Sequence, residues 1–482
     1  MARPVLGMVG PASKGKDLAL AQVVFENLRN RILDGLWRHG EKLPGTRVIA
    51  KDAGVSRWTA VMAVDMLLAE GLVETRKRSG TYVNWSGSGP ELRPDASGQA
   101  AGAVDGPKPH VPFAVGVPGL DLFPMHVWRR LQAKRWKDMP VDALQTGHDG
   151  GWPDLRAAIA AHVGATRGLK CTPAQVFVTT SAHAAVLLAA EVLCRAGSVV
   201  WMEEPGYFRT RAALQAAGVA PVAVAVDAQG INVEDGRRLA PKAAMAVVTP
   251  SFQFPTGVAL TDARKSELLE WSSQVGAFIL EDDFVCEFRH PRSATTPLAA
   301  LPNGQRVVYM NTFSTTIFPS LRLSYLIVPR AIADRFAEAL RRTERYATVP
   351  NQIVLADFLA LGHFAKHIRR CREAYAERQQ TLVEALRDEC AGLFAGEPMP
   401  SGMHVVVRFR GPIDDNAAAD AARAVGLIVE PLSRFYVGRA GQGGLLLGFA
   451  GFRPDALRDA VKRLAYALAP LRAAPDRAAA GA

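Results

Sequence analysis

The sequence predicts an α/β protein built from two domains, a small helical one followed by a larger one with a mostly parallel sheet. The chain has 482 residues, more than the roughly 250–300 that a single hydrophobic core usually serves. Residues 84–112 are rich in Gly, Pro, Ala and Ser and lack apolar periodicity, which is typical of a linker. After this linker, short apolar runs alternate with helical patterns, as they do where helices cover both faces of a parallel sheet.

These features divide the chain into five segments. We expect a tail at 1–17, a small domain at 18–83, the linker at 84–112, a large domain at 113–467 and a second tail at 468–482. No apolar run is long enough for a signal peptide or a membrane span, and the five cysteines lack the paired spacing of a metal site. We therefore expect a cytoplasmic protein that binds neither a membrane nor a structural metal.

The charge balance favours a polyanionic partner. The formal net charge is +11, and an excess of positive charge attracts nucleic acid. Residues 1–90 contain thirteen Lys and Arg against eight Asp and Glu, so the first fifth of the chain has almost half of the excess. An Arg-rich proteome would also make many of its proteins mildly basic, so the charge supports DNA binding without establishing it.

The small domain has the pattern of a winged helix-turn-helix. One helix is predicted within 18–35, and its apolar stripe consists of Leu20, Val24, Leu28 and Ile32. A short helix over Thr46–Ala53 and a turn follow, and Ser56 is placed to cap a third helix, Arg57–Glu70, which ends at Gly71. The predicted buried face of this third helix consists of Val61, Val64 and Leu68. The segments LVETR and TYVN then flank KRSG as a hairpin, which completes the motif.

This motif predicts the side chains that contact DNA. At the start of the third helix, Arg57 and Thr59 are expected to face base edges, and an Arg–guanine pair contributes about 1–3 kcal/mol of discrimination. Basic residues at the wing tip are expected at phosphates or in the minor groove. The stretches LPGTR, GVSR, LLAEGL and SGTYV resemble the DNA-binding domain of the GntR superfamily. With that resemblance, the expected DNA-binding set is Arg47, Ser56, Arg57, Thr59, Arg76, Lys77, Arg78, Gly80 and Thr81.

In the large domain, five apolar runs predict buried strands at 174–180, 198–203, 243–250, 276–283 and 306–313. Ligands of such sheets bind beyond the carboxyl ends of the strands. The segments GHDGGWPDLRAAIA, EEPGYFRTR, VTPSFQFPTGV, LEDDFVCEFR and GLLLGFAGF resemble the MocR-type branch of GntR regulators, in family order. The resemblance implies a large domain of the type I fold of pyridoxal 5′-phosphate (PLP)-dependent transferases, with a small C-terminal α+β subdomain, and a homodimer.

The resemblance also assigns a cofactor pocket. Asp282 matches the partner of the PLP pyridinium nitrogen, and Tyr207 matches the aromatic ring that stacks on the cofactor. Ser181, Ser314 and Arg322 match the groups that hold the phosphate. A structural alternative for Asp282 is a strand-end carboxylate that accepts hydrogen bonds from backbone amides.

Several residues depart from the family pattern. Thr315 stands where FSKT has the lysine that forms an imine with PLP, and threonine has no amine. Phe284 replaces a tyrosine of EDDY, and Phe252 replaces a histidine. Ala182 and His183 change the phosphate turn; His183 is either a new ligand contact or a packed histidine. The pocket is therefore expected to bind PLP only non-covalently, to bind another small molecule, or to serve dimerisation alone.

Together these patterns predict a transcription regulator that binds double-stranded operator DNA as a homodimer. Its aminotransferase-like domain is expected to be catalytically inactive and to respond to a small effector whose identity the sequence does not give. The alternatives are an aminotransferase-type PLP enzyme with an accessory DNA-binding module, and an interaction protein without a ligand.

Overall fold

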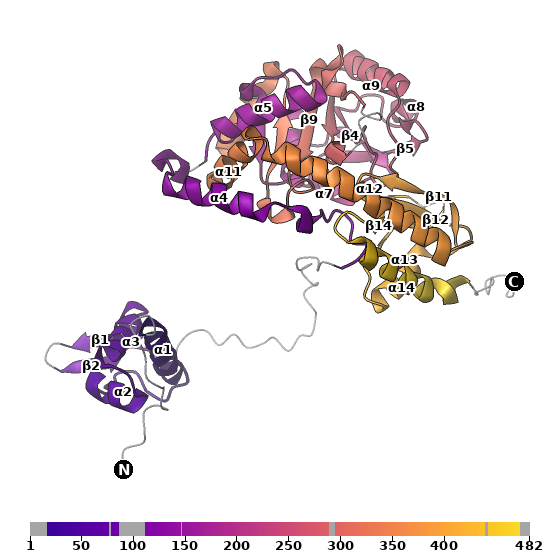
Figure 1. Ribbon diagram of the computed structural model, residues 1–482. Helices are drawn as coiled ribbons and strands as arrows, with labels where there is room; N and C mark the ends of the chain where they lie inside the picture. Colours follow the sequence, from indigo (N-terminus) through magenta and orange to yellow (C-terminus); the bar gives the residue numbers. More distant parts are fainter. Residues whose placement is uncertain are drawn as a thin grey trace. The chain divides into compact units, whose positions relative to one another are not determined.

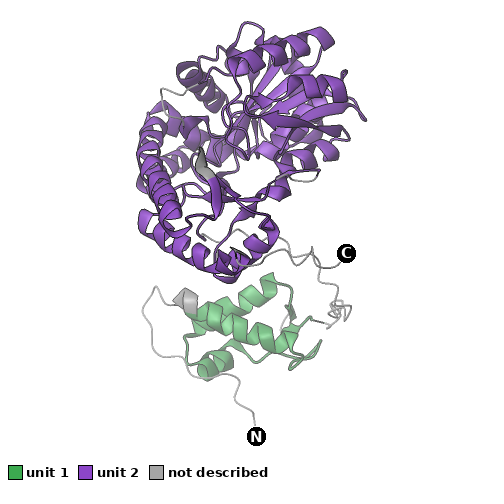
Figure 2. Ribbon diagram, turned by 90° about the vertical axis from the view of Figure 1, so that its right-hand side faces the viewer, with its two compact units in different colours: residues 1–104 green, residues 105–482 purple. Residues whose placement is uncertain are grey.

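The computed structural model describes residues 17–76, 79–85, 111–145, 147–288, 295–438 and 442–472 (Figure 1). The chain forms two compact units, residues 1–104 and residues 105–482, which Figure 2 shows in different colours. No helix among the described residues is long and apolar enough to cross a membrane. The two units are described in turn.

Unit 1 contains three helices and a hairpin, as the sequence predicts. The helices are α1 (Asp17–Leu33), α2 (Thr46–Ala53) and α3 (Arg57–Ala69), and the hairpin pairs β1 (Val73–Arg76) antiparallel with β2 (Gly80–Val83). A single bridge between Lys42 and Tyr82 joins the segment before α2 to the hairpin. The winged helix-turn-helix arrangement is therefore confirmed.

The core of unit 1 lies between α1 and α3. Val24, Leu28 and Ile32 of α1 are buried, which confirms the predicted stripe except at the half-buried Leu20. The predicted buried face of α3 is confirmed at Val64 and in part at Leu68, which packs against the core, but it was wrong at Val61. Its buried apolar side chains are Ala60, Ala63, Val64 and Leu67, whereas Val61 and Leu68 are half-buried. The sequence RWTAVMAVDMLLA is apolar on almost every side, so its periodicity does not determine which side faces the core.

Unit 2 is built around a mixed sheet of eight strands in the order β3-β10-β9-β8-β7-β4-β5-β6. The strands are β3 (Val176–Thr179), β4 (Val199–Glu204), β5 (Ala220–Asp227), β6 (Gly230–Ile231), β7 (Met245–Val248), β8 (Phe278–Asp282), β9 (Val307–Thr312) and β10 (Ser324–Ile327). The five predicted strands are confirmed as β3, β4, β7, β8 and β9. Strand β10 runs antiparallel to both of its neighbours, β3 and β9, whereas β5, β4, β7, β8 and β9 are mutually parallel.

Helices cover both faces of this sheet (Figure 1). On one face lie α6 (Ala182–Leu193), α7 (Phe208–Ala216) and α10 (Ala333–Thr343). The other face is covered by α4 (Met125–Lys137), α5 (Pro153–Arg167), α8 (Val233–Leu239), α9 (Asp262–Val275) and α11 (Val349–Ala360). Successive residues of β7 alternate between the two layers, so Val247 packs beneath α6 and Val248 beneath α9. Burial on both faces explains why these strands are continuous apolar runs.

The C-terminal part of unit 2 is an α+β subdomain. It contains α12 (His363–Glu389), α13 (Asp415–Ala424) and α14 (Pro454–Arg472), with an antiparallel sheet in the order β11-β12-β14-β13. The strands are β11 (Phe394–Ser401), β12 (His404–Phe409), β13 (Glu430–Pro431) and β14 (Gly444–Gly448). Helix α14 continues to Arg472, past the expected start of a tail at 468, because Leu468 extends its buried apolar face.

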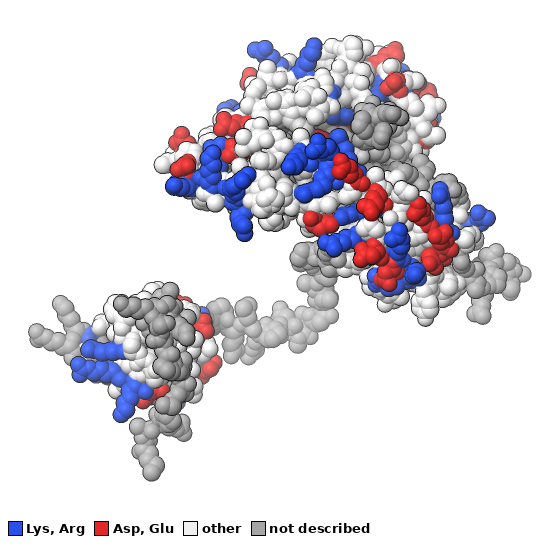
Figure 3. All heavy atoms as spheres, in the orientation of Figure 1, with Lys and Arg blue, Asp and Glu red and all other residues white. Residues whose placement is uncertain are grey.

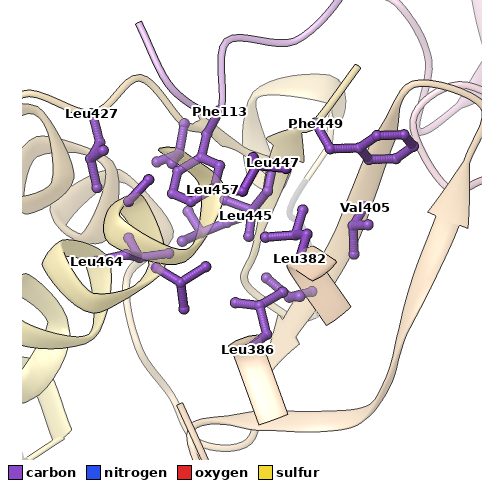
Figure 4. Packing of buried hydrophobic residues seen from close by; sticks show 14 of the residues in the cluster. Phe113, Leu382, Leu386, Val405, Leu427, Leu445, Leu447, Phe449, Leu457 and Leu464 are labelled. Atoms are coloured by element: carbon purple, nitrogen blue, oxygen red, sulfur yellow. The ribbon is translucent and has the colours of Figure 1, made fainter. Parts of the chain in front are cut away.

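The segment that follows the linker packs against this C-terminal subdomain. Phe113 bridges to Gly448, whose N–H donates to the Phe113 carbonyl at 2.8 Å. Figure 4 shows the Phe113 ring among Leu445, Leu447 and Leu457, which are fully buried. A side chain at position 448 would lie 2.2 Å from the carbonyl oxygen of Ala114, so glycine is required for this close approach.

Candidate nucleic-acid interface and ligand pocket

The start of α3 presents two large side chains to solvent. The Ser56 Oγ atom accepts a hydrogen bond from the backbone N–H of Thr59 at 3.1 Å, which confirms the predicted cap. Because the cap fixes the first turn, the two residues after it, Arg57 and Trp58, point outward and are both exposed. Trp58, which the sequence analysis did not select, exposes 67% of its surface.

Thr59 is a correction to the expected DNA-contacting set. Its side chain is only 1% exposed, and its Oγ1 lies 2.8 Å from the Ser56 Oγ. The expectation that Thr59 faces base edges was therefore wrong, since α3 turns this residue away from solvent. The hydrogen bond between the two hydroxyl groups instead helps to hold Ser56 in its capping position.

Helix α2 and the hairpin add further exposed cations. Arg47 is exposed on α2, and the guanidinium of Arg76 on β1 lies 4.5 Å from the centre of the Tyr82 ring. Arg76 also pairs with Glu74 at 2.7 Å. Lys77 and Arg78, expected at the wing tip, lie outside the described residues.

Gly80 and Thr81 have structural roles at the start of β2. Gly80 has a φ of +122°, and a side chain there would meet the Lys42 Cε atom at 2.7 Å. The carbonyl of Thr81, whose side chain is half-buried, accepts the N–H of Leu43 at 2.8 Å. Both residues therefore hold the hairpin against the segment that leads into α2.

The charges of unit 1 are separated in space. Exposed cations lie on the segment before α2, on α2, at the start of α3 and on the hairpin: Lys42, Arg47, Lys51, Arg57 and Arg76. Figure 3 shows basic side chains gathered on the side of α2 and the hairpin, with most acidic ones toward the other side. At the far end of α3, Glu70 forms an ion pair with Arg29 of α1 at 2.8 Å. One end of unit 1 therefore has the positive charge that a DNA backbone requires.

In unit 2, the sheet register brings the predicted pocket residues to one edge. Strands β3, β8 and β9 all point the same way, since β10 is antiparallel to both β3 and β9. Ser181 follows the end of β3, Asp282 is the last residue of β8, and Ser314 follows the end of β9. Their carboxyl-terminal edge is where α/β sheets bind ligands.

Hydroxyl groups that the sequence analysis missed lie beneath this edge. The Ser324 Oγ donates to the Thr312 Oγ1 at 2.8 Å, and the same Thr312 oxygen accepts the Ser314 N–H at 3.1 Å. The Thr179 hydroxyl donates to the Ser181 carbonyl at 3.2 Å. These residues stand at strand ends, and that position was the one signal in the sequence that would have identified them.

Ser181 also begins helix α6. Its Oγ accepts the backbone N–H of Ala184 at 3.1 Å, so the serine that matches a phosphate ligand acts as a helix cap. Ala182 is half-buried in the first turn. His183 is exposed, and its Nδ1 lies 3.2 Å from the Arg209 carbonyl oxygen. The positive end of this helix is therefore directed at the sheet edge.

Asp282 has a buried oxygen that no described residue contacts by a hydrogen bond. Among the described residues its Oδ1 atom lacks a partner. Burial, together with the neighbouring carboxyl groups of Asp283 and Glu203, raises the pKa of Asp282 to about 8. A cation placed against this oxygen would satisfy both the missing contact and the ionised form.

The acids beside Asp282 are already bound within the protein. Asp283 pairs with Arg167 at 2.6 Å and accepts the Tyr309 hydroxyl at 2.9 Å. Glu281 accepts the N–H groups of Leu298 and Ala299 at 2.9 and 3.0 Å. Asp282 and Asp283 each keep one buried oxygen without a hydrogen bond among the described residues, but only Asp283 has an arginine beside it.

Glu203, at the end region of β4, is a further buried acid near the pocket. Thr249 donates to it through its N–H at 3.2 Å and through its hydroxyl at 2.6 Å. Burial raises the pKa of Glu203 to about 7 despite these hydrogen bonds. This carboxyl group has the partners that Asp282 lacks.

Thr315 is occupied by a contact within the protein. Its hydroxyl donates to the backbone carbonyl of Phe284 at 2.8 Å. Lys265 is the most deeply buried lysine of the described residues in unit 2, with 1% exposure, and its Nζ donates to Asp262 and to the Thr296 carbonyl, both at 3.1 Å. That ammonium group belongs to the start of α9, so it does not replace an amine at position 315.

Aromatic side chains line the same region. Phe254 makes edge contacts with Tyr207, Phe284 and Phe435, with ring centres 5.2–5.9 Å apart. Tyr207 remains 39% exposed. Phe252 is half-buried and packs against the core of the C-terminal subdomain. Arg322 is exposed, and its φ of +54° places it in the left-handed region.

Comparisons with known proteins agree with this division. Residues 20–83 match the family of bacterial regulatory proteins called gntR, and residues 110–464 match the class I and II aminotransferase family. The chain is 35% identical over 469 residues to a probable rhizopine catabolism regulatory protein, MocR, of Rhizobium meliloti, covering 94% of this chain and 95% of that one. It is 32% identical to the HTH-type transcriptional regulator TauR of Rhodobacter capsulatus, covering 93% and 96%.

A solved structure resembles unit 2. The kynurenine aminotransferase of Pyrococcus horikoshii superposes with a TM-score of 0.67 and 25% identity, covering 74% of this chain and 90% of the enzyme. The type I transferase fold is thereby confirmed, and this fold belongs to a PLP-binding family. With a helix-turn-helix unit ahead of an aminotransferase-like unit, and regulators of the same composition matching over nearly their full length, the chain belongs to the MocR-type transcription regulators of the GntR family.

Proposed function

We propose that unit 2 of this regulator does not catalyse transamination and instead binds a small ligand, with PLP held without a covalent bond. One observation supports this most directly. At position 315 a hydroxyl group donates to the Phe284 carbonyl, while Asp282 keeps a buried oxygen without a hydrogen bond among the described residues. The pocket thus retains a group for a cationic ring nitrogen but has no amine for an aldehyde.

The remaining groups fit a non-covalent PLP. Asp282 would hold the pyridinium nitrogen, and Ser181, Ser314 and Arg322 would hold the phosphate with the start of α6. PLP supplies, when bound, an electron-withdrawing ring whose aldehyde condenses with amines. Phe284 has no hydroxyl for the phenolic oxygen of the ring, and Thr315 has no amine. These residues can therefore bind and orient the ring but cannot exchange a covalent bond with it.

Unit 1 supplies the DNA contacts in this proposal. Helix α3 would enter the major groove with Arg57 at base edges, and Arg47 and Arg76 would lie against phosphates, with Lys77 and Arg78 at the wing tip. In the described chain, large apolar residues are exposed within 120–144 of unit 2: Leu120, Met125, Trp136, Val141 and Leu144. Such residues favour an interface between two copies. A two-fold dimer, acting in the cytoplasm, would bind paired half-sites.

A PLP titration of the purified full-length protein tests the pocket. We expect thermal stabilisation by PLP without the visible absorbance of an imine, and a smaller stabilisation for Asp282→Asn. Thr315→Lys provides the matched gain, because it supplies the missing amine and should produce the imine band. An imine band in the unaltered protein would contradict the proposal. Absence of both stabilisation and band would contradict PLP as the ligand and direct the search to other metabolites.

The rival function is an aminotransferase with an accessory DNA-binding module. Amino donors, a keto acid and PLP are incubated with the protein, and the amino acid product is measured over many equivalents of protein. We expect no turnover, because position 315 has no lysine amine to form the imine and to transfer the proton. Sustained turnover would establish the enzyme instead.

Variants of Arg57 test the DNA contact. Arg57→Ala should weaken binding to a selected operator by roughly 5- to 150-fold, the equivalent of about 1–3 kcal/mol. Arg57→Lys keeps the charge but cannot form the planar two-bond contact with guanine. It should therefore retain binding to random DNA and lose most of the preference for the operator. An unchanged operator affinity for Arg57→Ala would contradict the assignment of α3 as the recognition helix.

A further inference from the structure

Trp58 is exposed to an extent that its side chain rarely tolerates. Its indole ring is 67% exposed in the first turn of α3, between the exposed Arg57 and the buried Thr59. Tryptophan is strongly buried on average because its ring removes a large apolar area from water. An indole left in solvent at this position costs solubility, so a role outside the folding of unit 1 is indicated.

Within the described part of the chain, Trp58 has no structural role. It is absent from the apolar core of unit 1, whose indole rings at its margin are Trp37 and Trp85. Its ring pairs with no aromatic ring or cation of the described residues, and its Nε1–H donates to none of them. By contrast, Trp201 of unit 2 is fully buried, stacks on Trp271 and donates to the Ala240 carbonyl.

The surroundings of Trp58 fit nucleic acid better than an apolar protein surface. Arg57 precedes it, and the neighbouring helix α2 exposes Arg47 and Lys51. The start of α3 also contributes the positive end of the helix dipole. An apolar partner would have to desolvate these cations, whereas DNA satisfies them with phosphates and offers one apolar group in the major groove. That group is the C5-methyl of thymine.

We infer that Trp58 recognises a thymine methyl group in each half-site of the operator. This inference rests on the proposed function, in which the start of α3 enters the major groove. Arg57 would bind a guanine through two hydrogen bonds, and the indole ring of Trp58 would cover the methyl group of a neighbouring thymine. Trp58 is then a specificity-determining residue that adds apolar contact to a surface otherwise selective through charge and hydrogen bonds.

The test is a thermodynamic cycle between protein and DNA. Operator duplexes are first selected from random DNA with the full-length protein, and each thymine is then replaced singly by deoxyuridine, which removes only the methyl group. At one thymine per half-site, the unaltered protein should lose about three- to tenfold in affinity. Trp58→Ala should bind the thymine and deoxyuridine duplexes equally, so the two changes are not additive.

Two further variants make the result specific. Trp58→Phe keeps an aromatic ring and should retain part of the thymine preference. Val23→Ala, at an exposed apolar residue of α1, should leave the preference unchanged. If Trp58→Ala retains the full thymine preference, or if no thymine methyl group matters to the unaltered protein, the inference is overturned while DNA binding stands. If the unaltered protein selects no DNA sequence, the proposed function itself fails.

Discussion

The two units place their functional groups differently relative to their cores. In unit 1 the candidate groups stand on the surface, since Arg47, Arg57 and Arg76 are exposed and the core lies behind them. In unit 2 the candidate groups lie at the edge of a buried sheet, where Asp282 adjoins the buried pair of Arg167 and Asp283. Substitutions in unit 1 should thus change binding with little effect on folding, whereas substitutions in unit 2 should change both.

From this difference we expect the two units to tolerate substitutions in different ways. A surface that binds DNA through exposed side chains can exchange them without rebuilding its core. A buried pocket must satisfy the polar groups that it encloses, whichever side chain stands at each position. Thr315 does so through the Phe284 carbonyl, and Asp283 through Arg167 and Tyr309. Asp282 keeps a buried oxygen without a partner and, unlike Asp283, forms no ion pair among the described residues.

The largest effect is expected for Arg167→Ala. The side chains of Arg167 and Asp283 are 7% and 0% exposed, and removal of the arginine leaves a buried carboxylate without its cation. Loss of one partner of a buried pair costs about 3–5 kcal/mol. Denaturant unfolding of unit 2 measures this loss.

An exposed ion pair of the same unit provides the matched control. Arg345 pairs with Glu191 at 3.0 Å, with side chains 44% and 24% exposed. Arg345→Ala should cost at most about 1 kcal/mol, because water screens exposed pairs. If Arg167→Ala and Arg345→Ala lowered the stability equally, the buried pair of Arg167 and Asp283 would not stabilise unit 2 more than an exposed pair does.

A smaller effect of opposite sign is expected for Asp282→Asn without ligand. Burial raises the pKa of Asp282 from 3.8 to about 8, so the folded state binds the proton more tightly than the unfolded state. The stability of the unaltered protein therefore falls as pH rises from about 4 to about 8, and the neutral asparagine removes this loss. We expect a stabilisation that is largest near pH 8 and vanishes near pH 4. Melting temperatures of both proteins across this range would refute the expectation if their difference did not change with pH.

The sequence predicted more of unit 1 than of unit 2. Helix α2 has its predicted bounds and Ser56 caps α3, since caps and turns are local signals. The orientation of α3 was not predictable, because an almost wholly apolar helix offers no polar face to orient it. Thr59 was assigned to the DNA surface from its place at the start of α3 and from the family resemblance, but its side chain is buried.

In unit 2, long-range contacts limited the prediction. Buried strands are continuous apolar runs, so β7 and β8 were found, but the four-residue antiparallel strand β10, within the apolar stretch 323–328, was not selected. The run Glu281-Asp282-Asp283 located the pocket. Whether each acid meets a cation or a backbone amide depends on Arg167, Leu298 and other residues distant in sequence.

The smallest effect concerns Ser56, where the two roles of unit 1 can be separated. Ser56→Ala removes the acceptor of the Thr59 N–H and should destabilise unit 1 by about 1 kcal/mol, as loss of a helix cap usually does. Ser56→Asp retains an acceptor and adds a negative charge at the positive end of α3, so unit 1 should keep its stability. The same charge would face DNA phosphates, and the operator affinity should fall. Ser56→Ala should therefore show the larger loss of thermal stability, and Ser56→Asp the larger loss of operator affinity. If Ser56→Asp bound DNA as tightly as the unaltered protein, the exposed start of α3 would not lie against the phosphate backbone. Unit 1 would then lack the surface site that distinguishes it from the buried pocket of unit 2.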